Sequence, residues 1–146
     1  MSIDPYALLA GMPHLTLEVH RLPDDEMGRW IPSLHTIVLD DRLDQAERRC
    51  TLVHEMVHHM SGDQLSGLPP ELALMQERLC KERTARLLIA LPALADAMAW
   101  SEHAEEIADH LWVDEPTLWD RLEHLTAEEH DYLTARMASH PRENSA

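Results

Sequence analysis

The sequence has no phenylalanine, only four glycines and only two cysteines among its 146 residues. The scarcity of glycine, together with abundant leucine, alanine, glutamate and arginine, favours helix over sheet. Cys50 and Cys80 lack a CxxC spacing, which argues against a zinc ribbon and against a disulfide framework. We expect both to be small buried residues in a reducing compartment. Without phenylalanine, the core is expected to be mainly aliphatic, with the four tryptophans as its large side chains.

Positive charge and long apolar runs are also scarce. Twelve lysines and arginines face 27 aspartates and glutamates, so the formal net charge is −15 with neutral histidines. A surface of that charge repels phosphate backbones and anionic lipid headgroups, which argues against direct nucleic-acid binding. No apolar run approaches the roughly 20 residues that cross a bilayer, and the N-terminus lacks a basic segment followed by an apolar stretch. We therefore expect a soluble, cytoplasmic protein without a membrane partner.

What is present suits one domain of mixed structure. A length of 146 residues with 45% apolar side chains is enough for a sizeable core. Alternating or strongly apolar patterns predict three short strands, at residues 14–20, 28–33 and 35–40. The remainder of the chain is expected to be largely helical, so the predicted fold class is α+β.

The most informative motif is the HExxH run from His54 to His58. Asp44 and Glu47 form the pattern of a capping box, which predicts a helix from there to about Met60. One helical turn separates the two histidines, so both imidazoles face the same side and can bind one zinc ion. Glu55 lies beside them, where it can take a proton from a zinc-bound water, as a metallopeptidase requires.

Catalytic zinc usually has three protein ligands, so a third must lie elsewhere in the chain. The longer HExxHxxGxxH pattern is excluded, because Ser61 and Gln64 occupy its glycine and last histidine positions. The nearby carboxylates on the following predicted helix, which extends from Pro70 to about Leu91, are the remaining candidates: Glu71, Glu77 and Glu82.

Helical spacing distinguishes these three glutamates. Glu77 falls in a stripe of apolar or small residues, where a carboxylate needs a partner such as a metal. Glu82 has Arg86 one turn on, the pattern of a solvated ion pair, and Glu71 falls in the first turn. Lys81 lies one turn from Glu77, so a surface ion pair between them is the alternative to metal binding.

The segment Arg48–His58 resembles the metal motif of the ImmA/IrrE-type (DUF955) zinc metallopeptidases. In that family a second motif, ExxAxxFAxxLLMP, supplies the third ligand at its first position, which corresponds to Glu77. Cys80 stands in place of the first alanine of that motif and Arg83 in place of the aromatic residue. The resemblance covers roughly residues 14–91 and is closest to compact actinobacterial or actinophage members.

This resemblance implies a small gluzincin-like fold, in which a three-stranded antiparallel sheet packs on the HExxH helix. A single metallopeptidase domain would then span residues 1–146. We expect it to divide into a mainly sheet part, the active-site helices, a helical C-terminal part and a frayed tail, at 1–43, 44–91, 92–140 and 141–146. Residues 104–122 are similar to a helix-turn-helix core, but their acidic second helix favours a structural or partner-docking role over DNA reading.

The leading hypothesis is a zinc-dependent endopeptidase in which His54, His58 and Glu77 hold Zn²⁺ and Glu55 activates water. By resemblance, its substrate is a cytosolic regulatory protein of the repressor type, whose extended segment adds to the sheet edge near residues 35–40. His35 and His59 are candidates for assisting at the oxyanion or for plain solvated histidines. One rival is a zinc-retaining regulatory module without significant turnover, and another is an acidic helical protein with a chance HExxH and no metal.

Overall fold

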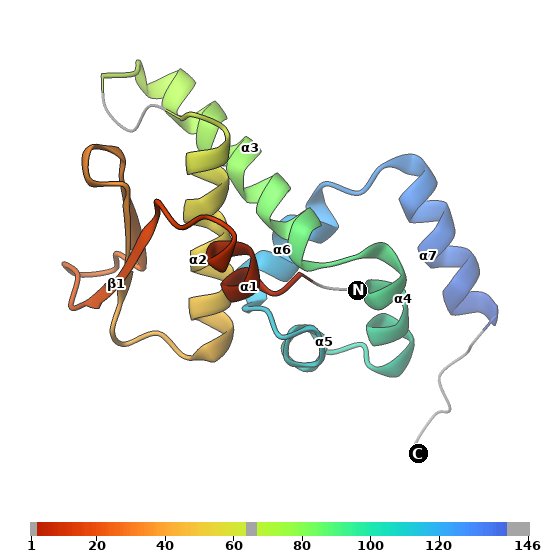
Figure 1. The fold of residues 1–146 in the computed structure, drawn as a ribbon. Coiled ribbons are helices and arrows are strands. Elements are labelled where there is room, and N and C mark those ends of the chain that lie inside the picture. Colours follow the sequence, from red (N-terminus) through yellow and green to blue (C-terminus); the bar gives the residue numbers. More distant parts are fainter. Residues whose placement is uncertain (1–2, 64–66, 140–146) are drawn as a thin grey trace.

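The computed structural model describes residues 3–63 and 67–139, and its fold is α+β, as predicted. This part of the chain contains a three-stranded sheet and seven α-helices (Figure 1). Along the chain the elements are α1 Pro5–Ala10, β1 Thr16–His20, β2 Gly28–Ile31, the 3₁₀ turn η1 Pro32–Leu34, β3 Thr36–Asp40, α2 Gln45–Met60, α3 Pro70–Leu88, α4 Leu91–Trp100, α5 Ala104–Leu111, α6 Glu115–Glu123 and α7 Ala127–Ser139. The predicted tail at 141–146 lies outside the described residues.

The sheet is mixed, so the prediction of an antiparallel sheet was wrong. The strand order is β1-β3-β2, with β2 antiparallel to β3 and β1 parallel to it. The short η1 turn, closed by His35 in the left-handed conformation, makes β2 and β3 an antiparallel hairpin. All five residues of β3 are buried, and its apolar run gains a partner on both edges by lying between β1 and β2.

Helix α2 lies between the sheet and the helices that follow it in the chain (Figure 1). It begins with the predicted capping box, in which the Asp44 carboxylate accepts from the Glu47 backbone N–H and the Glu47 carboxylate accepts from the Asp44 N–H. It ends at Met60, and Gly62 follows with a φ of 65°, a conformation that glycine adopts without strain. The prediction for this helix is confirmed at both ends.

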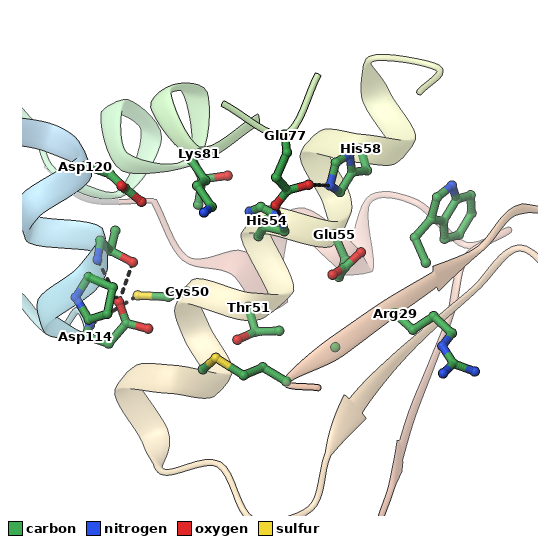
Figure 2. Close-up of a pocket in the computed structure, with 16 residues that line it drawn as sticks. Arg29, Cys50, Thr51, His54, Glu55, His58, Glu77, Lys81, Asp114 and Asp120 are labelled. Carbon is green, nitrogen blue, oxygen red and sulfur yellow. Dashed lines mark hydrogen bonds and ion pairs between the residues drawn. The ribbon is translucent and has the colours of Figure 1, made fainter. Parts of the chain in front are cut away.

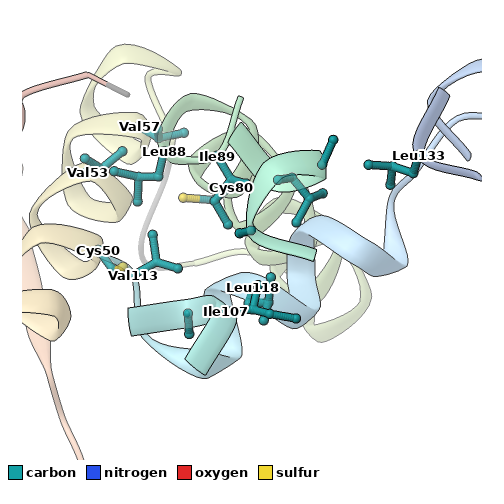
Figure 3. Close-up of a cluster of buried hydrophobic side chains, with 14 residues drawn as sticks. Cys50, Val53, Val57, Cys80, Leu88, Ile89, Ile107, Val113, Leu118 and Leu133 are labelled. Atoms are coloured by element: carbon teal, nitrogen blue, oxygen red, sulfur yellow. The ribbon is translucent and has the colours of Figure 1, made fainter. Parts of the chain in front are cut away.

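Two apolar clusters hold α2 in place. On the sheet side, Trp30 packs with Leu15, Ile37, Leu39, Leu52 and Met56. On the other side, Val53 and Val57 of α2 join a larger cluster to which the later helices contribute, including Leu88 and Leu118 (Figure 3). The expected role of tryptophan in the core is confirmed only for Trp30, because Trp100, Trp112 and Trp119 are 48–72% exposed.

The second predicted helix stops earlier than expected. Helix α3 ends at Leu88, and Ile89 and Ala90 are extended before α4 begins at Leu91. Pro92 explains the break, because a helix continued from Leu88 would lack one N–H donor and would meet the proline ring. The spacing of apolar residues did not predict α1 or α4 as separate helices. Within residues 3–63 and 67–139, no helix is long and apolar enough to cross a membrane.

Candidate metal centre

His54 and His58 lie one turn apart on α2 and face α3. Their ring centroids are 4.8 Å apart, and the ring planes are nearly perpendicular, at 87°. Glu77 of α3 reaches both rings: its Oε1 lies 2.8 Å from His54 Nε2, and its Oε2 lies 3.1 Å from His58 Nε2 (Figure 2). The structure therefore brings together the three residues predicted from sequence as metal ligands.

The other two glutamates point elsewhere. Glu82 pairs with Arg86 at 3.5 Å, as its spacing predicted, and Glu71 is exposed in the first turn of α3. The carboxylate of Glu77 contacts the two imidazoles, so the alternative of a solvated pair with Lys81 does not describe its position. The packing of α3 on α2 therefore favours Glu77 over Glu82 as the third ligand. Glu77 faces the two histidines of α2, whereas Glu82 pairs with Arg86 of its own helix.

The donor set suits a zinc ion. Two imidazoles and one carboxylate are the ligands of a common class of catalytic zinc site. Ligand atoms bound at about 2.1 Å to a tetrahedral zinc lie about 3.4 Å from one another. The two N···O distances of 2.8 and 3.1 Å are a few tenths of an ångström shorter, so the side chains need only a small separation to hold the ion.

A fourth residue orients one of these rings. Asp63, just after the end of α2, places its Oδ2 2.8 Å from His58 Nδ1. A carboxylate on the ring nitrogen that does not face the metal fixes the tautomer and strengthens the imidazole as a ligand. Asp63 was not predicted, because it lies in a loop five residues after its partner and no helical spacing indicates it.

Cys80 also reaches the centre. Its Sγ lies 3.6 Å from His54 Nδ1 and 3.8 Å from His54 Nε2, and its thiol donates to the His54 carbonyl at 3.2 Å. His54, His58 and Cys80 form a group whose ligand atoms all lie within 4.8 Å of one another. The prediction that Cys80 is buried is confirmed, with 1% exposed, but the sequence reading missed its place beside the histidines.

Electrostatics tie these side chains together. Burial alone would lower the pKa of His54, but the hydrogen bonds with Cys80 and Glu77 outweigh it and raise that pKa to about 10. The same two partners and Asp63 outweigh burial at His58 and raise its pKa to about 11. In return, the hydrogen bonds with the two imidazoles hold the pKa of Glu77 well below its usual range. A cation that bound here would compete with protons for the two rings.

Glu55 lies beside the centre, with 7% of its surface exposed, at the bottom of a cleft of about 440 Å³. The cleft lies between β2, α2, α3 and α6, and Figure 2 shows the Glu55 carboxylate pointing into the space between α2 and β2. Burial raises the pKa of Glu55, which moves this carboxylate toward the range of a general base that works near neutral pH.

The other two histidines weighed from sequence lie outside the cleft lining. His59 packs edge-on against Trp30, with ring centroids 4.8 Å apart, and His35 lies 6.4 Å from the same indole. His35 is exposed and His59 is partly buried. Both contribute to a ring cluster at the end of the sheet.

Comparison with protein-family models finds no match to this chain, and no curated protein matches it either.

Proposed function

We propose that this protein is a zinc-dependent endopeptidase of the ImmA/IrrE type, with a gluzincin-like arrangement of its active-site helices. The observation that carries the proposal is the contact of one carboxylate, from Glu77, with both imidazoles of the HExxH motif. His54, His58 and Glu77 would hold the ion, and Asp63 would fix the His58 ring. When bound, zinc supplies Lewis acidity that polarises the scissile carbonyl and acidifies the attacking water.

Glu55 is the general base in this proposal. Its carboxylate takes a proton from the attacking water and then delivers a proton to the amine of the departing chain. Its burial beside the two rings supports this role, because a partly desolvated carboxylate accepts a proton more readily than a solvated one.

The strand order favours a different place for the proposed substrate than the segment 35–40. Strand β3, which contains most of the 35–40 segment first considered, is the central strand and has both edges paired. Strand β2 is an edge strand, and its residues Gly28 to Trp30 line the cleft that contains Glu55. An extended peptide that adds to the free edge of β2 would cross the cleft close to the metal centre.

The proposed substrate is a cytosolic regulatory protein, possessing an extended segment that enters this cleft. A repressor-type regulator fits by resemblance to the ImmA/IrrE family. The net charge of −15 argues against a direct contact with nucleic acid. We therefore propose that the enzyme binds the regulator protein itself and makes no contact with the DNA to which that regulator binds.

A second candidate function is a zinc-holding regulatory module without significant turnover. Cys80 favours it, because a sulfur beside the two histidines adds a fourth donor to a centre that hydrolysis needs open.

Two substitutions and one control test the endopeptidase. Glu55→Gln should keep one zinc per chain and lose cleavage by about 10²-fold or more, because the amide cannot accept the proton. Glu77→Ala should lose most of its zinc, whereas Glu82→Ala should retain it. Metal content is measured by mass spectrometry after dialysis, and cleavage by sequencing the new termini in a random-sequence peptide library.

The outcomes separate the candidates. Zinc bound by the wild type and cleavage lost only with Glu55→Gln would support the endopeptidase. Zinc bound with no cleavage in the library or of repressor proteins would favour the module, and a chain that binds no zinc would contradict both.

A further inference from the structure

Cys80 occupies an unusual place for a buried structural thiol. It lies three residues after Glu77 on α3, so both side chains face α2 from the same side of the helix. Figure 3 shows its sulfur on the side that faces α2, within the apolar cluster. It contacts the backbone carbonyl and the ring of His54, a residue that the proposed function makes a zinc ligand.

The sulfur lies close to the distance that separates two ligands of one ion. A thiolate binds zinc at about 2.3 Å and an imidazole at about 2.0–2.1 Å, so in a tetrahedral site the sulfur and nitrogen lie about 3.6 Å apart. Cys80 Sγ lies 3.8 Å from His54 Nε2, close to this separation, and 3.6 Å from His54 Nδ1, so the sulfur lies beside the ring within reach of either nitrogen. The ligand atoms of His54, His58 and Cys80 also fall within a single span of 4.8 Å. A rotation of the Cys80 side chain toward the two Nε2 atoms would therefore let its sulfur share a cation with both histidines.

Cys50 shows what a structural thiol looks like in this fold. It lies one turn before His54 on α2 and is 3% exposed, and its sulfur accepts a hydrogen bond from the backbone N–H of Asp114. Its contact is with α6, on the side of the cleft away from His58. The two cysteines are thus a matched pair, equally buried, of which only Cys80 belongs to the His54–His58 group.

We propose that the Cys80 thiolate is a fourth ligand of the zinc and closes the site in its resting state. This inference rests on the zinc binding that the proposed function assigns to His54, His58 and Glu77. On binding, the thiol proton passes to solvent and the sulfur takes the position that a water would occupy. The site then hydrolyses peptides only when the sulfur leaves, so Cys80 restrains the activity of Glu55.

X-ray absorption at the zinc edge tests the ligand directly, without a substrate. The zinc-loaded wild type should show one sulfur at about 2.3 Å besides nitrogen and oxygen at about 2.0–2.2 Å. Cys80→Ser should lose the sulfur shell, and Cys50→Ala should keep it. Circular dichroism and thermal unfolding establish that each variant is folded, and the wild-type spectrum alone decides the question if one is not.

Zinc affinity and cleavage give two further readouts. Losing a direct ligand should weaken zinc binding at least tenfold in Cys80→Ser, since even indirect partners of a ligand contribute 10 to 100-fold. Cleavage of the peptide library, measured at saturating zinc, should rise in Cys80→Ser relative to the wild type.

These outcomes distinguish the role of Cys80 as a ligand from the proposed endopeptidase activity. Zinc bound with no sulfur in the wild type would overturn the role of Cys80 and leave the endopeptidase intact. Sulfur at the zinc with no cleavage by any variant would support Cys80 as a ligand and overturn the endopeptidase. A chain that binds no zinc would overturn both.

Discussion

At the scale of single residues, the central feature is an acid that is shared by two bases. Glu77 has 40% of its side chain exposed, whereas His58 has 5%, so the carboxylate approaches the rings from the open side of the centre. Each ring contacts a carboxylate oxygen, and under the proposed function a cation would bind here by replacing ring protons. The ring that is more deeply buried, His58, also has the additional partner Asp63.

We predict that Asp63→Ala weakens zinc binding by about 10 to 100-fold while the protein stays folded, because the substitution removes the acceptor that orients His58 and increases its basicity. Competition with a chromophoric chelator measures the affinity. Asp109→Ala, an exposed aspartate on α5, is the matched control. Equal affinities in the wild type and Asp63→Ala would show that the contact with His58 does not act on the metal.

The residues of the centre differ in how far sequence could predict them. His54, Glu55 and His58 are local, since helical geometry alone places them together. Glu77 required a stripe argument on a second helix together with a family resemblance. The places of Cys80 and Asp63 could not be predicted, because neither has a local sequence pattern. The position of Cys80 depends on how closely α3 packs on α2, and that of Asp63 depends on the path of the chain after Met60.

At the scale of elements, the cleft depends on a close approach of β2 to α2. Gly28 is the point of contact: a Cβ added there would lie 2.4 Å from Thr51 Cγ2 and 3.4 Å from Glu55 Cγ. The absence of a side chain at this position lets the strand edge lie against the helix beside the proposed general base. The requirement for glycine is thus one of space, since the position is part of a strand.

We predict that Gly28→Ala destabilises the fold by about 1–3 kcal/mol, the usual cost of overpacking, and lowers cleavage by displacing Glu55. Thr51→Ser removes the methyl group that the new Cβ would meet, so the double variant should recover part of the loss. Urea unfolding of the wild type, both single variants and the double variant measures this coupling. Purely additive effects would show that the strand and helix are not in close contact here.

Elements were predictable where their signals are local. The capping box at Asp44 and the stop at Gly62 bounded α2 correctly. The strand positions were close, but their pairing was not predictable, because alternation says which residues face the core and not which strand lies between the other two. The break between α3 and α4 depends on Pro92, which interrupts an apolar spacing that otherwise continues to Leu91.

At the scale of the whole molecule, a charge network joins the helices behind the centre. Arg121 of α6 is 3% exposed, donates to the Ile89 carbonyl between α3 and α4, and pairs with Glu129 of α7. Glu129 also pairs with Arg86 of α3 at 3.0 Å. The network therefore connects the helix that carries Glu77 and Cys80 to the C-terminal helices.

We predict an acid-sensitive contribution of Glu129 to stability. Its hydrogen bond with Arg121 lowers its pKa to about 2, so the stabilisation is complete above pH about 5 and is lost as the pH falls toward 2. Glu129→Gln should therefore lower the free energy of unfolding by on the order of 2 kcal/mol at pH 7, and the difference should shrink toward pH 2.

Urea unfolding at a series of pH values checks this prediction. Glutamine can keep the reciprocal capping contacts with Thr126, so the variant isolates the charge. Glu128→Gln, at the exposed neighbouring position, is the control. A Glu129→Gln difference that stayed constant from pH 7 to pH 2 would show that the ion pairs contribute nothing specific.

The most direct test of the whole account is a crystal structure of the zinc-loaded protein with anomalous diffraction at the zinc edge. The account predicts one anomalous peak, about 2.0–2.2 Å from His54 Nε2, from His58 Nε2 and from a Glu77 oxygen. A peak that lies away from these three residues, or no peak in protein saturated with zinc, would contradict it.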